Sequence, residues 1–125
     1  MSAALLEAGV VAIAGAVARG ETTSEAVTRA ALHRLETRGR RFNGVVTIEP
    51  DRALAMARAV DQARARGEAL GPLAGVPLAH KDLFYRAGRE APCGSKIRRG
   101  FVPETTASVL ARLDAAGAVD CGSLH

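Results

Sequence analysis

The sequence predicts an α/β fold, in which helices pack on a sheet built from short strands. Segments with apolar residues at helical spacing alternate with short apolar or β-branched runs that are typical of strands. Apolar residues make up 48% of the 125 residues, which is enough for the core of one domain. With 3 Phe, 1 Tyr and no Trp, that core must consist mainly of Ala, Val, Leu and Ile.

The amino-terminal part of the chain predicts two helices. Residues 4–18 are rich in Ala, Leu and Val, and this helix ends at Gly20, because glycine readily adopts the left-handed conformation that closes a helix. A second helix begins at Thr22, since Thr22 and Glu25 have the spacing of a capping box. It ends near Gly39, and its apolar stripe consists of Val27, Ala30, Ala31 and Leu35.

A strand and a third helix follow. The β-branched run Val45–Ile48 predicts a short strand. Pro50 begins the next helix, and Gly67 is a suitable end for it. The residues expected to face the core from this helix are Met56, Ala59, Val60 and Ala63.

A glycine- and proline-rich segment, Gly71–Gly75, leads into the most informative strand. The apolar run Val76–Ala79 predicts a buried strand, with Pro77 near its start or on an edge because proline lacks a backbone N–H. Lys81 and Asp82 then fall at the carboxyl end of this strand, which we expect to be central in the sheet with Lys81 partly buried. Open α/β sheets usually hold their ligands at that end.

The last part of the chain predicts a long loop, a helix and a strand. Residues 83–103 show no sustained period, which is typical of a loop that lies over the end of a sheet. Thr105 or Thr106 caps the helix and Gly117 ends it, and a strand begins at Ala118. The residues expected to face inward from this helix are Val109, Leu110 and Leu113.

Charge and hydropathy give little reason to expect nucleic-acid or membrane partners. The net charge is +4, but most arginines lie at helical spacing among acidic residues, which is typical of a solvated helix face. The apolar stretch Ala3–Ala18 is not preceded by a basic residue, and Glu7 interrupts it, so it does not predict a secretory signal. It is also shorter than the roughly 20 apolar residues of a membrane span. We expect a cytoplasmic protein.

The cysteines and histidines do not predict a metal site. Cys93 and Cys121 lack the spacing of CxxC or Cys/His ligand sets, so we expect free thiols and no metal or organic cofactor. Cys121 and His125 would supply only two of the four ligands that a structural zinc site needs. His33 lies on a polar helix face.

Lys81 is the strongest candidate for a functional residue. Chemistry that needs a base at neutral pH can use lysine, whose pKa falls on burial, but not arginine. Lys81 is one of two lysines in an arginine-rich chain and follows a predicted buried strand. The alternative is that Lys81 and Asp82 form an ion pair that merely closes the strand end.

An ordered series of motifs extends this prediction. The chain contains Gly71–Pro77, then Lys81-Asp82, Gly94-Ser95, Phe101–Pro103 and Leu113–Val119. In this order the motifs resemble the amino-terminal part of the amidase signature family. The resemblance covers about residues 23–125, so we divide the chain into a first helix, residues 1–20, and a partial amidase domain, residues 21–125.

The resemblance implies a mixed sheet with helices on both faces and a catalytic triad of a nucleophilic serine, a cis-peptide serine and a lysine. Lys81 matches the lysine of the family's Lys-Asp motif. The implied substrate is a small-molecule amide, hydrolysed through an acyl-enzyme without a cofactor. Both serines are expected in a glycine- and serine-rich segment that would follow residue 125.

Two features depart from the family pattern. Ser95, Ser108 and Ser123 are poor substitutes for the missing serines, because loop and capping roles suit them better. His80 occupies a position that is usually apolar in the family; if its side chain alternates away from Lys81, the pattern predicts a surface histidine.

Two other functions stay open. A non-catalytic pseudo-enzyme or partner-binding module would use the unpaired edge of the sheet to bind another chain. The resemblance also includes the A subunit of glutamyl-tRNA amidotransferase. In either case we expect the 125-residue chain alone to be inactive and to self-associate through its sheet edge.

Overall fold

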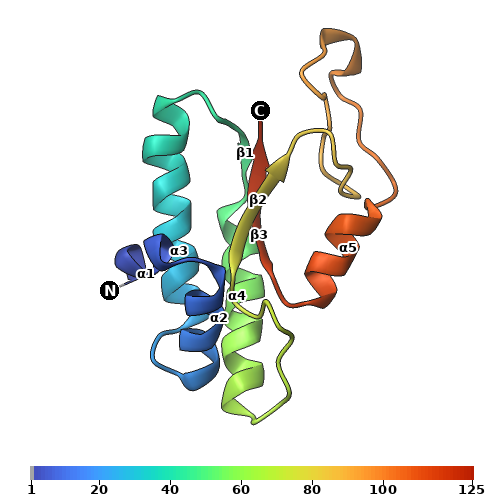
Figure 1. The fold of residues 1–125 in the computed structure, drawn as a ribbon. Coiled ribbons are helices and arrows are strands. Elements are labelled where there is room, and N and C mark those ends of the chain that lie inside the picture. The colour runs from blue at the N-terminus through green and yellow to red at the C-terminus, as the bar shows by residue number, and fades with distance from the viewer. Residues whose placement is uncertain (1) are drawn as a thin grey trace.

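The computed structural model describes residues 2–125 and confirms the predicted α/β fold (Figure 1). Its strands are β1 (Val45–Ile48), β2 (Pro77–Lys81) and β3 (Val119–Leu124). Its helical elements are α1 (Ser2–Ala8), α2 (Val10–Arg19), α3 (Ser24–Arg34), the π-helical turn η1 (Leu35–Gly39), α4 (Pro50–Ala65), the 3₁₀ turn η2 (Lys96–Arg98) and α5 (Ser108–Ala115).

The three strands form a mixed sheet in the order β1-β3-β2. β3 pairs antiparallel with β1 and parallel with β2, so the last strand of the chain lies in the middle of the sheet. In Figure 1, α1–α3 lie on one side of β2 and β3, and α5 with the long loop before it lies on the other. The expectation of a mixed sheet between helices is therefore confirmed.

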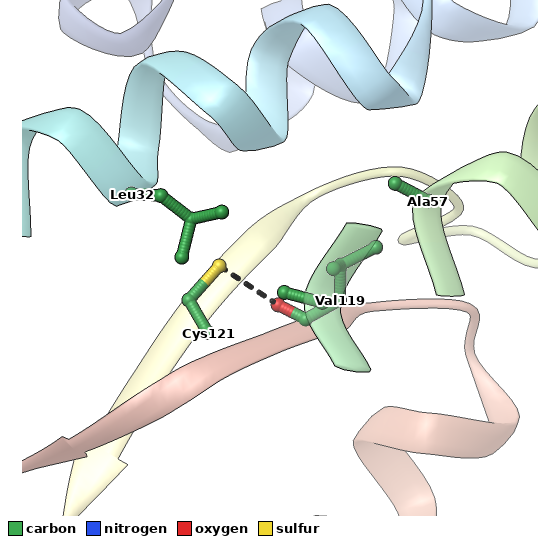
Figure 2. Packing of buried hydrophobic residues seen from close by; sticks show 5 residues of the cluster. Leu32, Ala57, Val119 and Cys121 are labelled. Carbon is green, nitrogen blue, oxygen red and sulfur yellow. Dashed lines mark hydrogen bonds between the residues drawn. The ribbon is translucent and has the colours of Figure 1, made fainter. Parts of the chain in front are cut away.

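The main core lies between β3 and the helices α3 and α4. Figure 2 shows Leu32 of α3 and Ala57 of α4 beside Val119 and Cys121 of β3. The Cys121 thiol donates to the carbonyl oxygen of Val119 at 3.7 Å. Burial, together with the charge of Asp120, raises the pKa of Cys121 from 9.0 to about 12. The thiol therefore stays protonated and packs as a small apolar side chain.

The first predicted helix is interrupted, which corrects the expectation of one helix over residues 4–18. Gly9 separates α1 from α2 and has φ 94° and ψ 176°, a conformation that only glycine adopts without strain. Its carbonyl oxygen accepts a hydrogen bond from the Ile13 N–H and so begins α2. Gly20 ends α2 in the left-handed conformation, as predicted.

The predicted capping box at Thr22 and Glu25 is wrong. Thr23 is the N-cap of α3, and its hydroxyl accepts from the Ala26 N–H at 3.0 Å. The carboxylate of Asp61 in α4 accepts from the N–H groups of Ser24 and Glu25 at 2.7 and 3.0 Å. Because Asp61 already satisfies these donors, the Glu25 side chain is free to pair with Arg29 and Arg58.

The second predicted helix ends near Gly39 as expected, but its last turn is a π-helix rather than an α-helix. The stripe predicted for α4 is displaced. Ala53 and Ala57 are its fully buried residues, whereas Ala59 is exposed. The α4 helix packs against both α3 and β3, so its buried face is set by two neighbours rather than by one apolar stripe.

The beginning of α5 also differs from the prediction. Ala107, not Thr105 or Thr106, is the N-cap, and no side chain caps the helix. The Thr106 hydroxyl instead accepts from the Ala87 N–H at 3.1 Å and ties the long loop to the start of α5. Leu110 is buried as expected, but Val109 is 45% exposed.

The predicted stop at Gly117 is confirmed and also explains a close contact. Gly117 has φ +92°, and a Cβ atom there would lie 2.8 Å from the Cα of Ala74. The segment around Ala74, which leads into β2, therefore packs directly against the backbone between α5 and β3. Within residues 2–125, no helix is long and apolar enough to cross a membrane.

Candidate functional site

Lys81 is the last residue of β2, so its predicted place at a strand end is confirmed. Two other expectations are wrong. The side chain is exposed rather than partly buried, and β2 is an edge strand rather than a central one. In the described residues 2–125, the Lys81 ammonium forms no hydrogen bond or ion pair. It is therefore available to a group brought by another segment or by a ligand.

The peptide group that links Lys81 to Asp82 is held from both sides. The Lys81 carbonyl oxygen accepts from the N–H groups of Leu83 at 2.8 Å and Phe84 at 3.2 Å, which form a tight turn after β2. The Asp82 N–H donates to the carbonyl oxygen of Leu124 at 2.8 Å. Asp82 is 6% exposed whereas the Lys81 side chain is exposed, and no ion pair joins them in the described residues, so the alternative of a Lys81–Asp82 pair that closes the strand end is not observed.

His80 is buried, which corrects the expectation of a surface histidine. It is 8% exposed, and its ring lies between the strand end and the loop of residues 83–107. Its Nδ1 atom is 3.1 Å from the Lys81 carbonyl oxygen. Its Nε2 atom is 2.8 Å from Nη1 of Arg89. The long loop covers this face of the sheet, so alternation away from Lys81 places His80 in the interior.

Two loop arginines share a carboxylate of β3 beneath His80. Arg86 and Arg89 are 3% and 5% exposed, and Asp120 is fully buried. The guanidinium of Arg86 forms an ion pair with Asp120 through Nε and a two-pronged pair with Asp114 at 2.8 and 3.0 Å. Planar guanidinium groups suit such paired hydrogen bonds with carboxylates.

Arg89 connects all three strands of the sheet. Its Nη1 atom lies 3.1 Å from Asp120 of β3, and its Nη2 atom donates to Glu49, the residue after β1, at 2.5 Å. Its contact with His80 adds β2. We call His80, Arg86, Arg89, Asp120 and their outer partners Glu49 and Asp114 the buried charge network.

The electrostatics of this network favour an ionised Asp120. Burial by itself opposes ionisation, but the positive charges of Arg89 and Arg86 outweigh it and lower the pKa of Asp120 from 3.8 to about 2. Burial lowers the pKa of Arg86 and Arg89, but their carboxylate partners outweigh it and raise both pKa values. These partners are Asp120 for both arginines, with Asp114 for Arg86 and Glu49 for Arg89. The charges are therefore stable only as a set.

Sequence reasoning missed the buried charge network, although two of its members left a signal. His80 directly follows the apolar run Val76–Ala79, which predicts a buried strand, and Asp120 directly follows the apolar start of the strand predicted from Ala118. A buried polar residue needs a partner, so two such residues in adjacent strands point to a shared polar cluster. Arg86 and Arg89 left no such signal, because the loop that carries them has no period.

The serines considered as substitutes lie apart in the fold. Ser95 is in the long loop, and Ser108 is the exposed first residue of α5. Ser123 is fully buried in β3 and pairs with His80 across the sheet. Within residues 2–125, no hydrogen bond joins any of the three to Lys81. The same residues contain no group of three or more His, Cys, Asp or Glu side chains placed to hold a metal ion.

Several known proteins resemble this chain. A model of the amidase family matches residues 26–125. The A subunit of the glutamyl-tRNA(Gln) amidotransferase of Streptomyces coelicolor is 46% identical over 113 residues, which cover 90% of this chain and 23% of that protein. The corresponding A subunit from Geobacter sulfurreducens is 45% identical over 109 residues, which cover 87% of this chain and 22% of that protein.

The fold has solved counterparts as well. The native peptide amidase of Stenotrophomonas maltophilia superposes with a TM-score of 0.86 at 34% sequence identity, covering 95% of this chain and 25% of that one. The chain thus spans about a quarter of the length of the relatives that it matches.

Proposed function

Because the chain belongs to the amidase signature family, we propose that the complete domain cleaves carbon–nitrogen bonds of amides with Lys81 as its general base. The observation that carries the proposal is the position of Lys81 at the last residue of β2, with an exposed amine and a fixed backbone. β2 and β3 run parallel, so their carboxyl ends lie at the same edge of the sheet. Ligands of α/β folds usually bind at that edge.

The proposed chemistry moves one proton along a relay. A neutral Lys81 amine accepts a proton from a bridging serine, which in turn accepts the proton of a nucleophilic serine. The nucleophile attacks the amide carbonyl carbon, and backbone N–H groups stabilise the resulting oxyanion. The nitrogen leaves as an amine once it has taken up the proton. Water or ammonia then attacks the acyl-enzyme and releases the product.

In this proposal both serines come from the part of the domain outside this segment. Ser123 does not replace them, because its hydroxyl is buried in β3 and Lys81 is exposed at the strand end. Lysine suits the role of base because it can lose its proton, whereas arginine remains protonated. The 125 residues alone are therefore expected to be inactive toward amides.

A chimera tests the proposal. Residues 1–125 would replace the matching segment of the Streptomyces coelicolor relative, and amide hydrolysis would be followed by ammonia release. We expect Lys81→Ala and Lys81→Arg to lower kcat by about 10²-fold or more, since general-base catalysis typically contributes that much. Lys96→Ala, which alters the other lysine, is the matched control. Near-normal turnover in both Lys81 variants would remove Lys81 from the mechanism.

A specific observation favours a second candidate, the A subunit of a tRNA-dependent amidotransferase. The relatives from Streptomyces coelicolor and Geobacter sulfurreducens both carry the name of such a subunit. In this role the nitrogen released from an amide would be transferred to a glutamyl-tRNA, and the acyl-enzyme would form on the same serine. Glutamine hydrolysis that rises when partner proteins and charged tRNA are added would favour it. Faster cleavage of peptide or aryl amides without partners would favour the simple amidase.

A further inference from the structure

The contacts of His80 define which of its ring nitrogens carries the proton. Arg89 can only donate hydrogen bonds, so its Nη1 atom at 2.8 Å requires a lone pair on Nε2. The Lys81 carbonyl oxygen can only accept, so the atom 3.1 Å away must be an Nδ1–H donor. Both contacts are satisfied by the neutral ring with its proton on Nδ1. The opposite tautomer would lose both.

The surroundings of His80 keep this arrangement in place. The Arg89 guanidinium is fixed by Asp120 at 3.1 Å and by Glu49 at 2.5 Å. Asp120 is fixed in turn by Arg86 and by the Gly122 N–H, which donates to it at 2.9 Å. An Nε2–H on His80 would face the Nη1 donor of Arg89 at 2.8 Å, so two donors would point at each other. Asp120, at 3.5 Å from Nε2, already serves both arginines.

The hydrogen bond from His80 completes a clamp on the peptide group after Lys81. The oxygen of this group accepts from His80 and from the turn formed by Leu83 and Phe84, and its N–H donates to Leu124 of β3. Lys81 is also paired with Leu124 in the β2–β3 ladder, so the backbone on both sides of its Cα atom is held. Together these contacts restrict the direction of the Lys81 Cα–Cβ bond relative to the sheet.

We propose that His80 is a positioning residue for Lys81, held in its Nδ1–H form by Arg89 and acting through the Lys81 carbonyl oxygen. The inference deepens the proposed function and rests on it. A merely space-filling role would not need the side chain to be a donor. An apolar residue would fill this place without a buried hydrogen bond to satisfy.

The first test is a spectroscopic signature that needs no variant. Long-range ¹H–¹⁵N correlation spectra of the chimera with the Streptomyces coelicolor relative, carrying ¹⁵N-labelled histidine, report which ring nitrogen of each imidazole is protonated. We expect His80 to show the Nδ1–H form. The exposed His33 serves as the reference for an unconstrained ring. A predominant Nε2–H form of His80 would overturn the inference.

The second test compares two variants at His80. In His80→Asn the side-chain amide can replace the Nδ1–H donor, whereas His80→Leu keeps the bulk and removes the donor. Hydrogen exchange of the Asp82 N–H should be about two- to tenfold faster in His80→Leu than in His80→Asn, the range expected for one net hydrogen bond. The Val119 N–H, which donates to Val76 at the other end of the same strand pair, is the control. Equal acceleration at both amides in both variants would show a packing role only.

The catalytic arm separates this inference from the proposed function. In the chimera, His80→Leu should lower kcat by about tenfold with little change in KM, and His80→Asn should retain most of the rate. Activity that depends on Lys81 but not on His80 would overturn the positioning role and leave the proposed function standing. The opposite result is that the spectra and exchange rates match our expectations while Lys81→Ala keeps its activity. In that case His80 does hold the backbone of Lys81, but Lys81 has no role in catalysis and the proposed function is refuted.

Discussion

Replacing Asp120 by asparagine removes the charge on which the buried charge network depends. The side chain keeps its shape, but Arg86 and Arg89 lose their common counter-ion inside the fold. Removing one partner of a buried ion pair typically costs about 3–5 kcal/mol, because the remaining charge stays desolvated. For a urea dependence of about 2 kcal/mol per M, the unfolding midpoint of Asp120→Asn should fall by about 2 M.

The pH dependence of stability gives an independent measure of the same group. The pKa of Asp120 is lowered in the fold from 3.8 to about 2, so the unfolded chain takes up the proton first as the pH falls. The stabilisation from Asp120 is therefore fully present above about pH 4 and is lost as the pH falls toward 2. The shift corresponds to about 2 kcal/mol, and Asp120→Asn should lack this part of the acid sensitivity.

Urea unfolding followed by circular dichroism, at about pH 6 and about pH 3, measures both effects. Asp51→Asn is the matched control, since Asp51 is exposed in the first turn of α4. If Asp120→Asn unfolds at the same urea concentration as Asp51→Asn at the higher pH, the network does not stabilise the fold as its geometry indicates. Equal acid sensitivity of the natural chain and Asp120→Asn would refute the electrostatic argument.

Three further predictions concern the fold. Gly117→Ala should lower the free energy of unfolding, measured with urea, by about 1–3 kcal/mol, because Gly117 has φ +92° and lies against Ala74. The control is Gly67→Ala, because Gly67 also has a positive φ of +71° but no atom within 4 Å of the added Cβ. Asp61→Asn should cost about 1 kcal/mol by weakening the cap of α3, again measured against Asp51→Asn. Finally, the 125-residue chain should bind a hydrophobic dye and elute from a size-exclusion column as mixed species, because β1 and β2 each have a free edge among the described residues 2–125. A single monomeric peak together with a sharp thermal unfolding transition would contradict this prediction.

The sequence by itself determined the features that depend on neighbouring residues along the chain. The β-branched run Val45–Ile48 became β1, and the apolar residues before Lys81 became β2. Gly20 and Gly117 end their helices where predicted, because a positive φ is a local property that glycine supplies. The place of Lys81 at a strand end followed from the same local pattern, supported by the order of the family motifs.

Only the tertiary structure decided what surrounds these elements. Asp61 caps α3 from 37 residues away, and Glu49 meets Arg89 across 40 residues, so neither partner is visible in a local pattern. The loop after β2 folds over one face of the sheet, which buries His80 while Lys81 remains in solvent. The alternation of side chains along a strand shows which residues share a face of the sheet. It does not show which distant segment packs on that face, and that segment decides whether a side chain is buried and which polar partner it finds.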